Sequence, residues 1–174
     1  LAAGTVLVTA GAWTAQVSPL LGAHAPMRPV RGQALRLRAP GAAFTRIIKQ
    51  RGIYLIPDVD GTVIVGATTE AESGFNARPT AHGIAEVTAA ALALAPVLAD
   101  AEVIQTWAGL RPESATGHVV LGPVADVNGL YIAAGHYKTG IGLAPLTGRV
   151  MAAWIAEGEP GIEVAAFAPG PAAG

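Results

Sequence analysis

The most regular pattern of apolar positions lies near the C-terminal end of the chain, over residues 130–156. Residues 130–134 form an apolar run typical of a buried strand, and a glycine-punctuated turn follows at 135–140. Beyond the turn, apolar residues recur at near-helical spacing, and Gly158 marks the expected end of the helix. The pattern therefore predicts a strand, a turn and a long helix.

Alternating apolar and polar positions predict strands elsewhere. Residues 34–38 alternate leucine with arginine, which is typical of a half-exposed antiparallel strand. Residues 53–57 and 62–68 lie on either side of Asp60-Gly61, a dipeptide that favours the positive-φ turn of a β-hairpin. Residues 103–114 are expected to form a further long strand that runs into a loop.

Shorter elements complete the expected fold. Residues 5–9 are typical of a short buried strand, and residues 13–21 suit a short helix. Thr80 is expected to cap an alanine-rich helix that ends before Pro96. Together these elements predict an α+β fold in which helices flank a mixed, mainly antiparallel sheet.

Composition excludes several classes of function. The 174 residues carry a net charge of −1 and 52% are hydrophobic, so we expect a globular chain that binds neither nucleic acid nor a membrane. Apolar stretches are broken before the roughly 18 residues that a spanning helix needs. Cysteine is absent and the four histidines are not clustered, so no metal site is expected. The lack of cysteine is compatible with a cytoplasmic location.

Three groups of residues are candidates for chemistry. The turn at 135–140 leaves N–H groups at a helix start, where the helix dipole favours an electron-rich oxygen or an anion. Arg111 has a planar fork that suits a carboxylate, and Tyr54 offers a hydroxyl on the strand face opposite Leu55. Each also has a structural reading: a packing unit, a surface charge beside Pro112, and a core or rim tyrosine.

The order and spacing of these motifs resemble the C-terminal part of the D-amino-acid-oxidase family of FAD-dependent oxidoreductases, in particular its glycine oxidases of thiamine biosynthesis. The resemblance rests on the Tyr54 hairpin, on WAGLRP at 107–112 and on GHYKTGIGLAPLTG at 135–148. The segment TAGAWT at 9–14 is a weaker match. The G-x-G-x-x-G fingerprint that would hold the FAD pyrophosphate is not found in this sequence.

The resemblance implies a role for each motif. Arg111 would anchor the substrate carboxylate, Tyr54 would donate a hydrogen bond to it, and Lys138 would contact the substrate where glycine oxidases often carry arginine. An ammonium group cannot reproduce a bidentate fork, so the choice among amines stays open. No residue is implied as a catalytic base or a metal ligand. The residues implied in FAD binding are Gly11, Trp13, Gly135, His136, Tyr137, Gly140, Ile141 and Gly142.

The same resemblance implies a domain organisation. Residues 1–22 would end a segment of the FAD domain, and residues 23–122 would form the substrate-binding domain. Residues 123–158 would be the FAD-contacting strand, turn and helix of an incomplete FAD-binding domain, followed by a flexible tail at 159–174. Because the chain begins with Leu1 and not Met, we expect it to be the downstream part of a longer polypeptide.

The implied function is oxidative deamination of glycine or another small amino acid or amine. Hydride would pass from the substrate to FAD, and dioxygen would then form hydrogen peroxide. Two alternatives stay open: a sarcosine or D-amino-acid oxidase or dehydrogenase, and a non-catalytic fragment or subunit without its own nucleotide-binding fold. The expected partners are the small substrate and either a second copy of the chain or the missing nucleotide-binding half.

Overall fold

The computed structural model describes residues 3–39, 44–125 and 127–170. The chain divides into two compact units, of which unit 1 is Leu1–Pro29 with Arg111–Gly174 and unit 2 is Val30–Leu110. The chain passes between the units within two long strands, β2 (Met27–Arg38) and β6 (Glu102–Ser114). Each unit has its own sheet and its own apolar core.

Unit 1 is built on a three-stranded mixed sheet in the order β1 (Val6–Val8), β8 (Leu130–Ala134) and β7 (Val120–Pro123). β1 runs parallel to β8, with Val8 opposite Ile132, and β7 runs antiparallel to β8. The predicted N-terminal strand is therefore paired with the strand that precedes the glycine-rich turn, and it forms one edge of the sheet.

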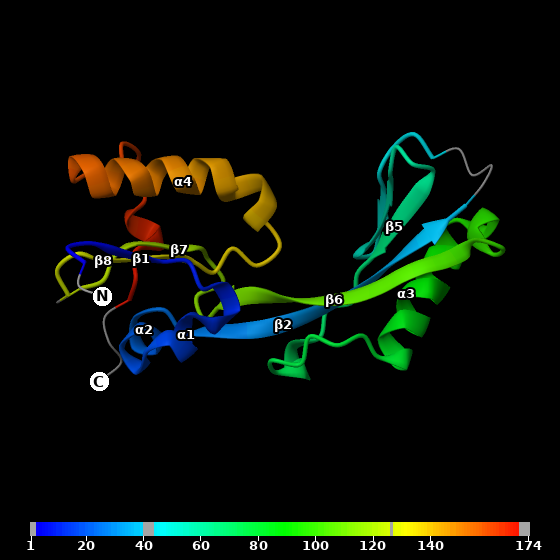
Figure 1. The fold of residues 1–174 in the computed structure, drawn as a ribbon, viewed down its shortest axis with the longest axis horizontal. Coiled ribbons are helices and arrows are strands. Elements are labelled where there is room, and N and C mark those ends of the chain that lie inside the picture. The colour runs from blue at the N-terminus through cyan, green and yellow to red at the C-terminus, as the bar shows by residue number, and fades with distance from the viewer. Residues whose placement is uncertain (1–2, 40–43, 126, 171–174) are drawn as a thin grey trace. The chain divides into compact units, whose positions relative to one another are not determined.

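One face of this sheet is covered by α4 (Gly140–Glu157), as Figure 1 shows. Met151 of this helix packs with Leu121 and Ala133 of the strands. The helix ends at Gly158, whose φ of 86° is the left-handed conformation that favours glycine at a helix C-terminus. The structure thus confirms the predicted strand, turn and helix.

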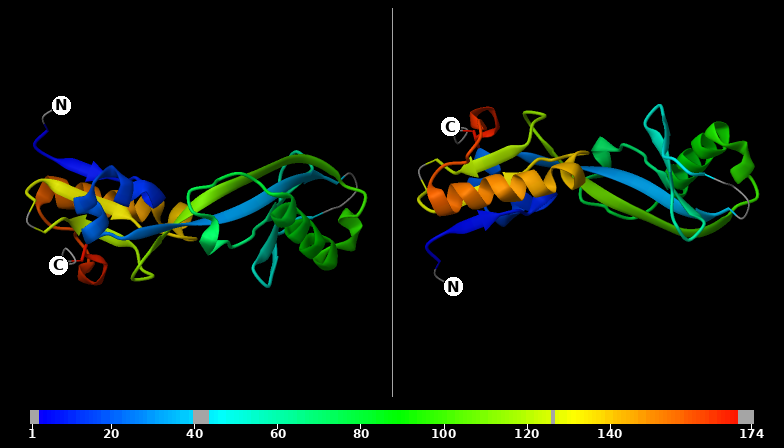
Figure 2. Two further views of the ribbon diagram at one scale, coloured as in Figure 1. Left: turned by 90° about the horizontal axis from the view of Figure 1, so that it is seen from below. Right: turned by 90° about the horizontal axis from the view of Figure 1, so that it is seen from above.

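The opposite face carries two short helices, α1 (Thr14–Val17) and α2 (Pro19–His24), which Figure 2 shows on the far side of the sheet from α4. Apolar side chains of α2 and β8 form a buried cluster between them. The prediction of one helix over 13–21 is wrong, because Ser18 is extended and its side chain instead accepts a hydrogen bond from the N–H of Leu20.

The C-terminal segment packs on unit 1, although the sequence leads us to expect a flexible tail at 159–174. Val164 is buried, and a short 3-10 helix, η4 (Ala165–Phe167), follows it. His24 and Gly170 then exchange two hydrogen bonds: Nδ1 of His24 lies 2.7 Å from the Gly170 carbonyl oxygen, and the Gly170 N–H donates to the His24 carbonyl at 2.9 Å. The described part of the tail is therefore held at the end of α2.

Unit 2 is a five-stranded sheet in the order β3 (Ile48–Gln50), β4 (Ile53–Pro57), β5 (Thr62–Gly66), β2 and β6. The pairs β3–β4, β4–β5 and β5–β2 are antiparallel. β4 and β5 form the predicted hairpin, with Gly61 at a φ of 78° in the turn.

One face of this sheet packs against α3 (Ala81–Leu94), through a core in which Leu35, Leu55 and Val65 contact Val87. The alternate residues of the same strands, including Tyr54, point to the other face. Two 3-10 helices flank this helix in the chain, η2 (Ala71–Ser73) before it and η3 (Pro96–Leu98) after it. The two units together are the mixed, mainly antiparallel α+β fold that the sequence predicts.

A buried polar cluster joins the N-terminus of α3 to the sheet. Thr80 caps the helix by accepting a hydrogen bond from the N–H of Gly83 at 3.1 Å, which confirms the predicted cap. The buried Gln33 amide donates to Thr80 Oγ1 at 3.0 Å and to Glu70 Oε1 at 2.8 Å. Arg31 Nε donates to the other Glu70 oxygen at 2.9 Å. Arg31 is thus a structural residue of unit 2.

Within the described residues, no helix combines the length and the apolar character needed to cross a membrane.

The Glu70 carboxylate should make the stability of the chain depend on acid pH. Burial alone raises the pKa of Glu70, but hydrogen bonds from Thr68, Arg31 and Gln33 outweigh it, so its pKa lies below the ordinary value of 4.5. The unfolded chain therefore takes up the proton at a higher pH than the folded chain. Stability is present above pH 4.5 and is lost as the pH falls through the lower folded pKa.

We expect Glu70→Gln to reduce the slope of unfolding free energy against pH below 4.5, measured by urea denaturation. Glu72→Gln is the matched control, because Glu72 is exposed and should keep the wild-type slope. Equal slopes for all three proteins would contradict this assignment.

Candidate functional site

The glycine-rich turn after β8 has a backbone that few residues could adopt. Gly135 has a φ of 76° and is buried, and a Cβ atom there would lie 3.1 Å from the His118 carbonyl oxygen and 3.2 Å from the Ser114 Cβ atom. Tyr137 has a φ of 48°, which costs a residue with a side chain roughly 1–2 kcal/mol. Such backbone conformations concentrate at functional sites.

A backbone hydrogen bond fixes this turn beside the part of β6 that carries Arg111. The N–H of Tyr137 donates to the carbonyl oxygen of Pro112 at 3.0 Å. Arg111 is half-buried and directly precedes Pro112 at the end of β6. Unit 1 therefore brings together the predicted carboxylate anchor and the predicted FAD-contacting turn, which are more than 20 residues apart in the chain.

The start of α4 leaves backbone donors for a ligand. No side chain caps it, because the Thr139 hydroxyl donates to the His136 carbonyl oxygen at 2.8 Å instead. The first helical hydrogen bond runs from Leu143 N–H to the Thr139 carbonyl. Within the described residues, the N–H groups of Gly140, Ile141 and Gly142 have no acceptor outside the helix. Together with the helix dipole they favour an electron-rich edge of a ligand.

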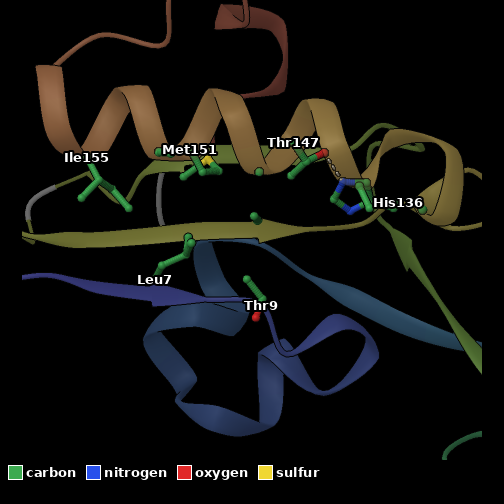
Figure 3. A pocket seen from close by; sticks show the side chains of 11 residues that line it. Leu7, Thr9, His136, Thr147, Met151 and Ile155 are labelled. Atoms are coloured by element: carbon green, nitrogen blue, oxygen red, sulfur yellow. Dashed lines mark hydrogen bonds between the residues drawn. The ribbon is translucent and has the colours of Figure 1, made fainter.

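An apolar groove of about 480 Å³ runs along α4 from this helix start. Figure 3 shows Ile155 and His136 at its two ends, with Leu7 and Thr9 of the N-terminal segment opposite the helix. Most of the helix residues facing it are small, so a flat ligand or a packed element can approach the helix backbone closely. The lining residues on α4 are Gly140, Ala144, Thr147, Gly148, Met151, Ala152 and Ile155.

His136 closes one end of the groove and is bound to α4. Its Nε2 atom lies 2.9 Å from Oγ1 of Thr147, the bond drawn in Figure 3. Desolvation by burial lowers the pKa of His136 below its ordinary value of 6.5, so the ring is neutral at pH 7. Sequence reasoning missed Thr147, although it lies on the same side of the helix as Gly140 and Ala144.

The remaining predicted FAD-binding and substrate residues of unit 1 lie at its surface. Lys138 is exposed, and its Nζ atom lies 5.1 Å from the centre of the Tyr137 ring, within the range of a cation–π interaction. Gly11 and Trp13 lie in a 3-10 helix, η1 (Gly11–Trp13), directly after β1. Gly11 has a φ of 55°, and Trp13 is 46% exposed.

Tyr54 lies in unit 2, on the sheet face opposite α3. Its side chain is half-buried, and its hydroxyl makes no hydrogen bond to any described residue. It therefore keeps a free donor for a ligand. It lies directly across the hairpin from Gly66, a neighbour whose importance the sequence pattern alone does not show.

Known proteins match the chain over most of its length. A family model described as FAD dependent oxidoreductase matches residues 1–154. Glycine oxidase of Pseudomonas aeruginosa is 38% identical over 164 residues, which are 94% of this chain and 45% of that protein.

Solved structures agree with the family match. The structure of iminodiacetate oxidase (IdaA) from Chelativorans sp. BNC1 matches with a TM-score of 0.91 and 36% identity, over 100% of this chain and 48% of that one. The structure of glycine oxidase from Geobacillus kaustophilus matches with a TM-score of 0.91 and 32% identity, over 99% and 47%. The chain thus spans about half the length of the relatives that it matches.

The neutral state of His136 can be tested in this chain without a ligand. We expect the ring protons of His136 to titrate by NMR with a midpoint below 6.5, because burial disfavours the charged form. A His136→Gln variant identifies the resonance. A midpoint at or above 6.5 would show that the ring is solvated or paired with an acid.

Proposed function

This chain belongs to the family of FAD-dependent oxidoreductases, and from that premise we propose that it contacts the flavin ring and the substrate in an enzyme that oxidises the C–N bond of glycine or another small amino acid. The observation that carries the proposal is the hydrogen bond from Tyr137 N–H to the Pro112 carbonyl. It holds the carboxylate-binding candidate, Arg111, beside the turn at 135–140.

The residues of unit 1 fit a flavin. The uncapped N–H groups of Gly140 and Gly142 suit the electron-rich pyrimidine edge, and the apolar groove beside them suits the flat ring system. No Cβ atom stands at either glycine, and a Cβ at Gly142 would meet no atom within 4 Å, so the backbone is open to a ligand there. When bound, FAD would accept two electrons from the C–N bond and pass them to dioxygen, giving hydrogen peroxide.

The side chains around the turn would then bind and orient the flavin ring, and the redox chemistry would be that of FAD. His136 and Tyr137 would wall the ring, and Gly11 and Trp13 would contact the cofactor from the segment after β1. A neutral His136 adds no positive charge beside the ring. Ile141 is 97% exposed and can contact a ligand at the helix start.

Substrate binding would fall to three side chains. Arg111 offers two parallel N–H donors to the substrate carboxylate, and Tyr54 offers a hydroxyl that has no other partner among the described residues. Lys138 would supply a second positive charge beside the Tyr137 ring. An amine that binds in its neutral form needs no dedicated base, so none of these residues has to remove a proton.

Two alternatives differ in substrate or in class. The same residues would serve a sarcosine or D-amino-acid oxidase or dehydrogenase, which a substrate panel and a peroxide assay distinguish. A non-catalytic subunit would need its nucleotide-binding half from elsewhere. The exposed edge of the sheet at β1 favours this alternative, because Val6 and Leu7 are 46% and 38% exposed there and could pack against a further element. A role in thiamine biosynthesis and a cytoplasmic location are part of the same proposal.

Replacement of Arg111 tests the substrate assignment. In the enzyme with its nucleotide-binding half, Arg111→Ala should lower kcat/KM for glycine roughly 10- to 100-fold, mainly through KM, because charge-assisted hydrogen bonds to the carboxylate are lost. Arg46→Ala, at an exposed site in unit 2, is the matched control and should leave both constants unchanged. Steady-state kinetics would contradict the assignment if Arg111→Ala behaved like the control.

The partner assignment is tested by cofactor retention. We expect this chain to keep FAD through gel filtration when it is co-expressed with the N-terminal half of the Pseudomonas aeruginosa glycine oxidase, and to lose FAD when it is alone. The physical reason is that the turn and the groove would contact only the flavin ring of FAD. The sequence contains no phosphate-binding fingerprint that would hold the pyrophosphate. Retention of FAD by the chain alone would contradict the assignment of a nucleotide-binding partner.

A further inference from the structure

The aromatic ring of Tyr54 lies across Gly66. The two residues are directly paired between β4 and β5, and Gly66 is in turn paired with Ala34 on β2. A Cβ atom at Gly66 would lie 2.5 Å from Cζ and 2.8 Å from Cε2 of Tyr54, and closer still to the hydroxyl oxygen. The space that a side chain would fill at Gly66 is therefore occupied by the ring and its hydroxyl.

The crowding at Gly66 comes from a side chain. Gly66 is absent from the glycines with positive φ, whereas Gly61 in the turn of the same hairpin has a φ of 78°. The φ angle of Gly66 by itself therefore does not require glycine. Tyr54 alone supplies the three nearest atoms that an added Cβ would meet.

The neighbouring row of the same sheet face shows the contrast. Ile56, Ile64 and Arg36 are paired there across β4, β5 and β2, and all three have full-sized side chains. In the row of Tyr54, the strands on the β5 side carry glycine and alanine, and Lys49 of β3 is paired with Tyr54 on the other side. The small residues on the β5 side leave room for the Tyr54 ring to lie over that part of the sheet.

The strand that carries Gly66 is held firmly two residues further on. Thr68 Oγ1 accepts a hydrogen bond from Gln33 N–H at 2.9 Å and donates to Glu70 at 2.5 Å. Gln33 lies next to Ala34, so β2 and the end of β5 cannot easily separate to admit a larger residue at position 66. A clash at Gly66 must be relieved by movement of the Tyr54 ring.

We propose that Gly66 is a positioning residue for the substrate carboxylate: its missing side chain lets the Tyr54 ring lie on the sheet and so fixes where the hydroxyl points. The inference rests on the proposed role of Tyr54 in binding the substrate. A methyl group at position 66 would push the ring away by about 1 Å to reach ordinary van der Waals distance. A displacement of about 1 Å in a substrate-positioning group can cost about 100-fold in rate.

Kinetics of the complete FAD-loaded enzyme test the inference through a double-mutant cycle with glycine as substrate. We expect Gly66→Ala and Tyr54→Phe each to raise KM roughly 10- to 100-fold with a smaller change in kcat. The double variant should be no worse than Tyr54→Phe alone, because Gly66 acts only through the hydroxyl. A merely structural glycine would give additive losses or a loss in kcat and stability alone, which would overturn the inference.

The outcomes separate this inference from the proposed function. If Tyr54→Phe leaves KM unchanged, the substrate role of Tyr54 fails. If Tyr54→Phe raises KM but Gly66→Ala does not, the substrate role stands and the positioning role of Gly66 fails.

A second measurement needs neither FAD nor a stable Gly66 variant. Because the ring lies across Gly66, the Gly66 α-protons should show upfield ring-current shifts by NMR in this chain, and Tyr54→Leu should abolish them. Gly109→Ala is the matched control, because a Cβ at that sheet glycine would meet no atom within 4 Å and should leave the shifts unchanged. Unshifted Gly66 protons in the wild-type chain would overturn the packing on which the inference depends.

Discussion

The hydrogen bond from Tyr137 N–H to the Pro112 carbonyl is the contact on which the site of unit 1 depends. It forms only if Tyr137 takes a left-handed backbone conformation, and it needs the buried, side-chain-free turn that Gly135 provides. The cost of holding a tyrosine at a φ of 48°, roughly 1–2 kcal/mol, must be offset by the surrounding turn. This turn brings the C-terminal part of β6, which carries Arg111, close to the residues that precede α4.

The site separates two kinds of recognition. Backbone donors and small residues along α4 suit a flat, electron-rich ring, because they allow close approach without charge of their own. The charged fork of Arg111 suits the carboxylate of a small amino acid. The half-buried, neutral His136 fits the first group, since it brings no charge of its own to the groove.

The local elements of this fold could be predicted from the sequence, and the contacts between distant residues could not. Asp60-Gly61 and Gly158 predict the hairpin and the helix end because positive-φ backbone favours glycine whatever surrounds it. The bond between His136 and Thr147, and the packing of Tyr54 on Gly66, depend on register and helix phase that only folding reveals. The roles proposed for Arg111 and Tyr54 rest on motif resemblance, since periodicity alone assigns no function to an arginine beside a proline or to a tyrosine at the rim of a strand.

The most direct test of the proposed activity is to add glycine anaerobically to the complete FAD-loaded protein and record the visible absorbance of the flavin. The account predicts that the absorbance bleaches with glycine and returns on admission of air, with one peroxide formed per flavin reoxidised. A flavin that stays oxidised with glycine, sarcosine and D-alanine alike would contradict the central claim that this fold binds and oxidises a small amino acid.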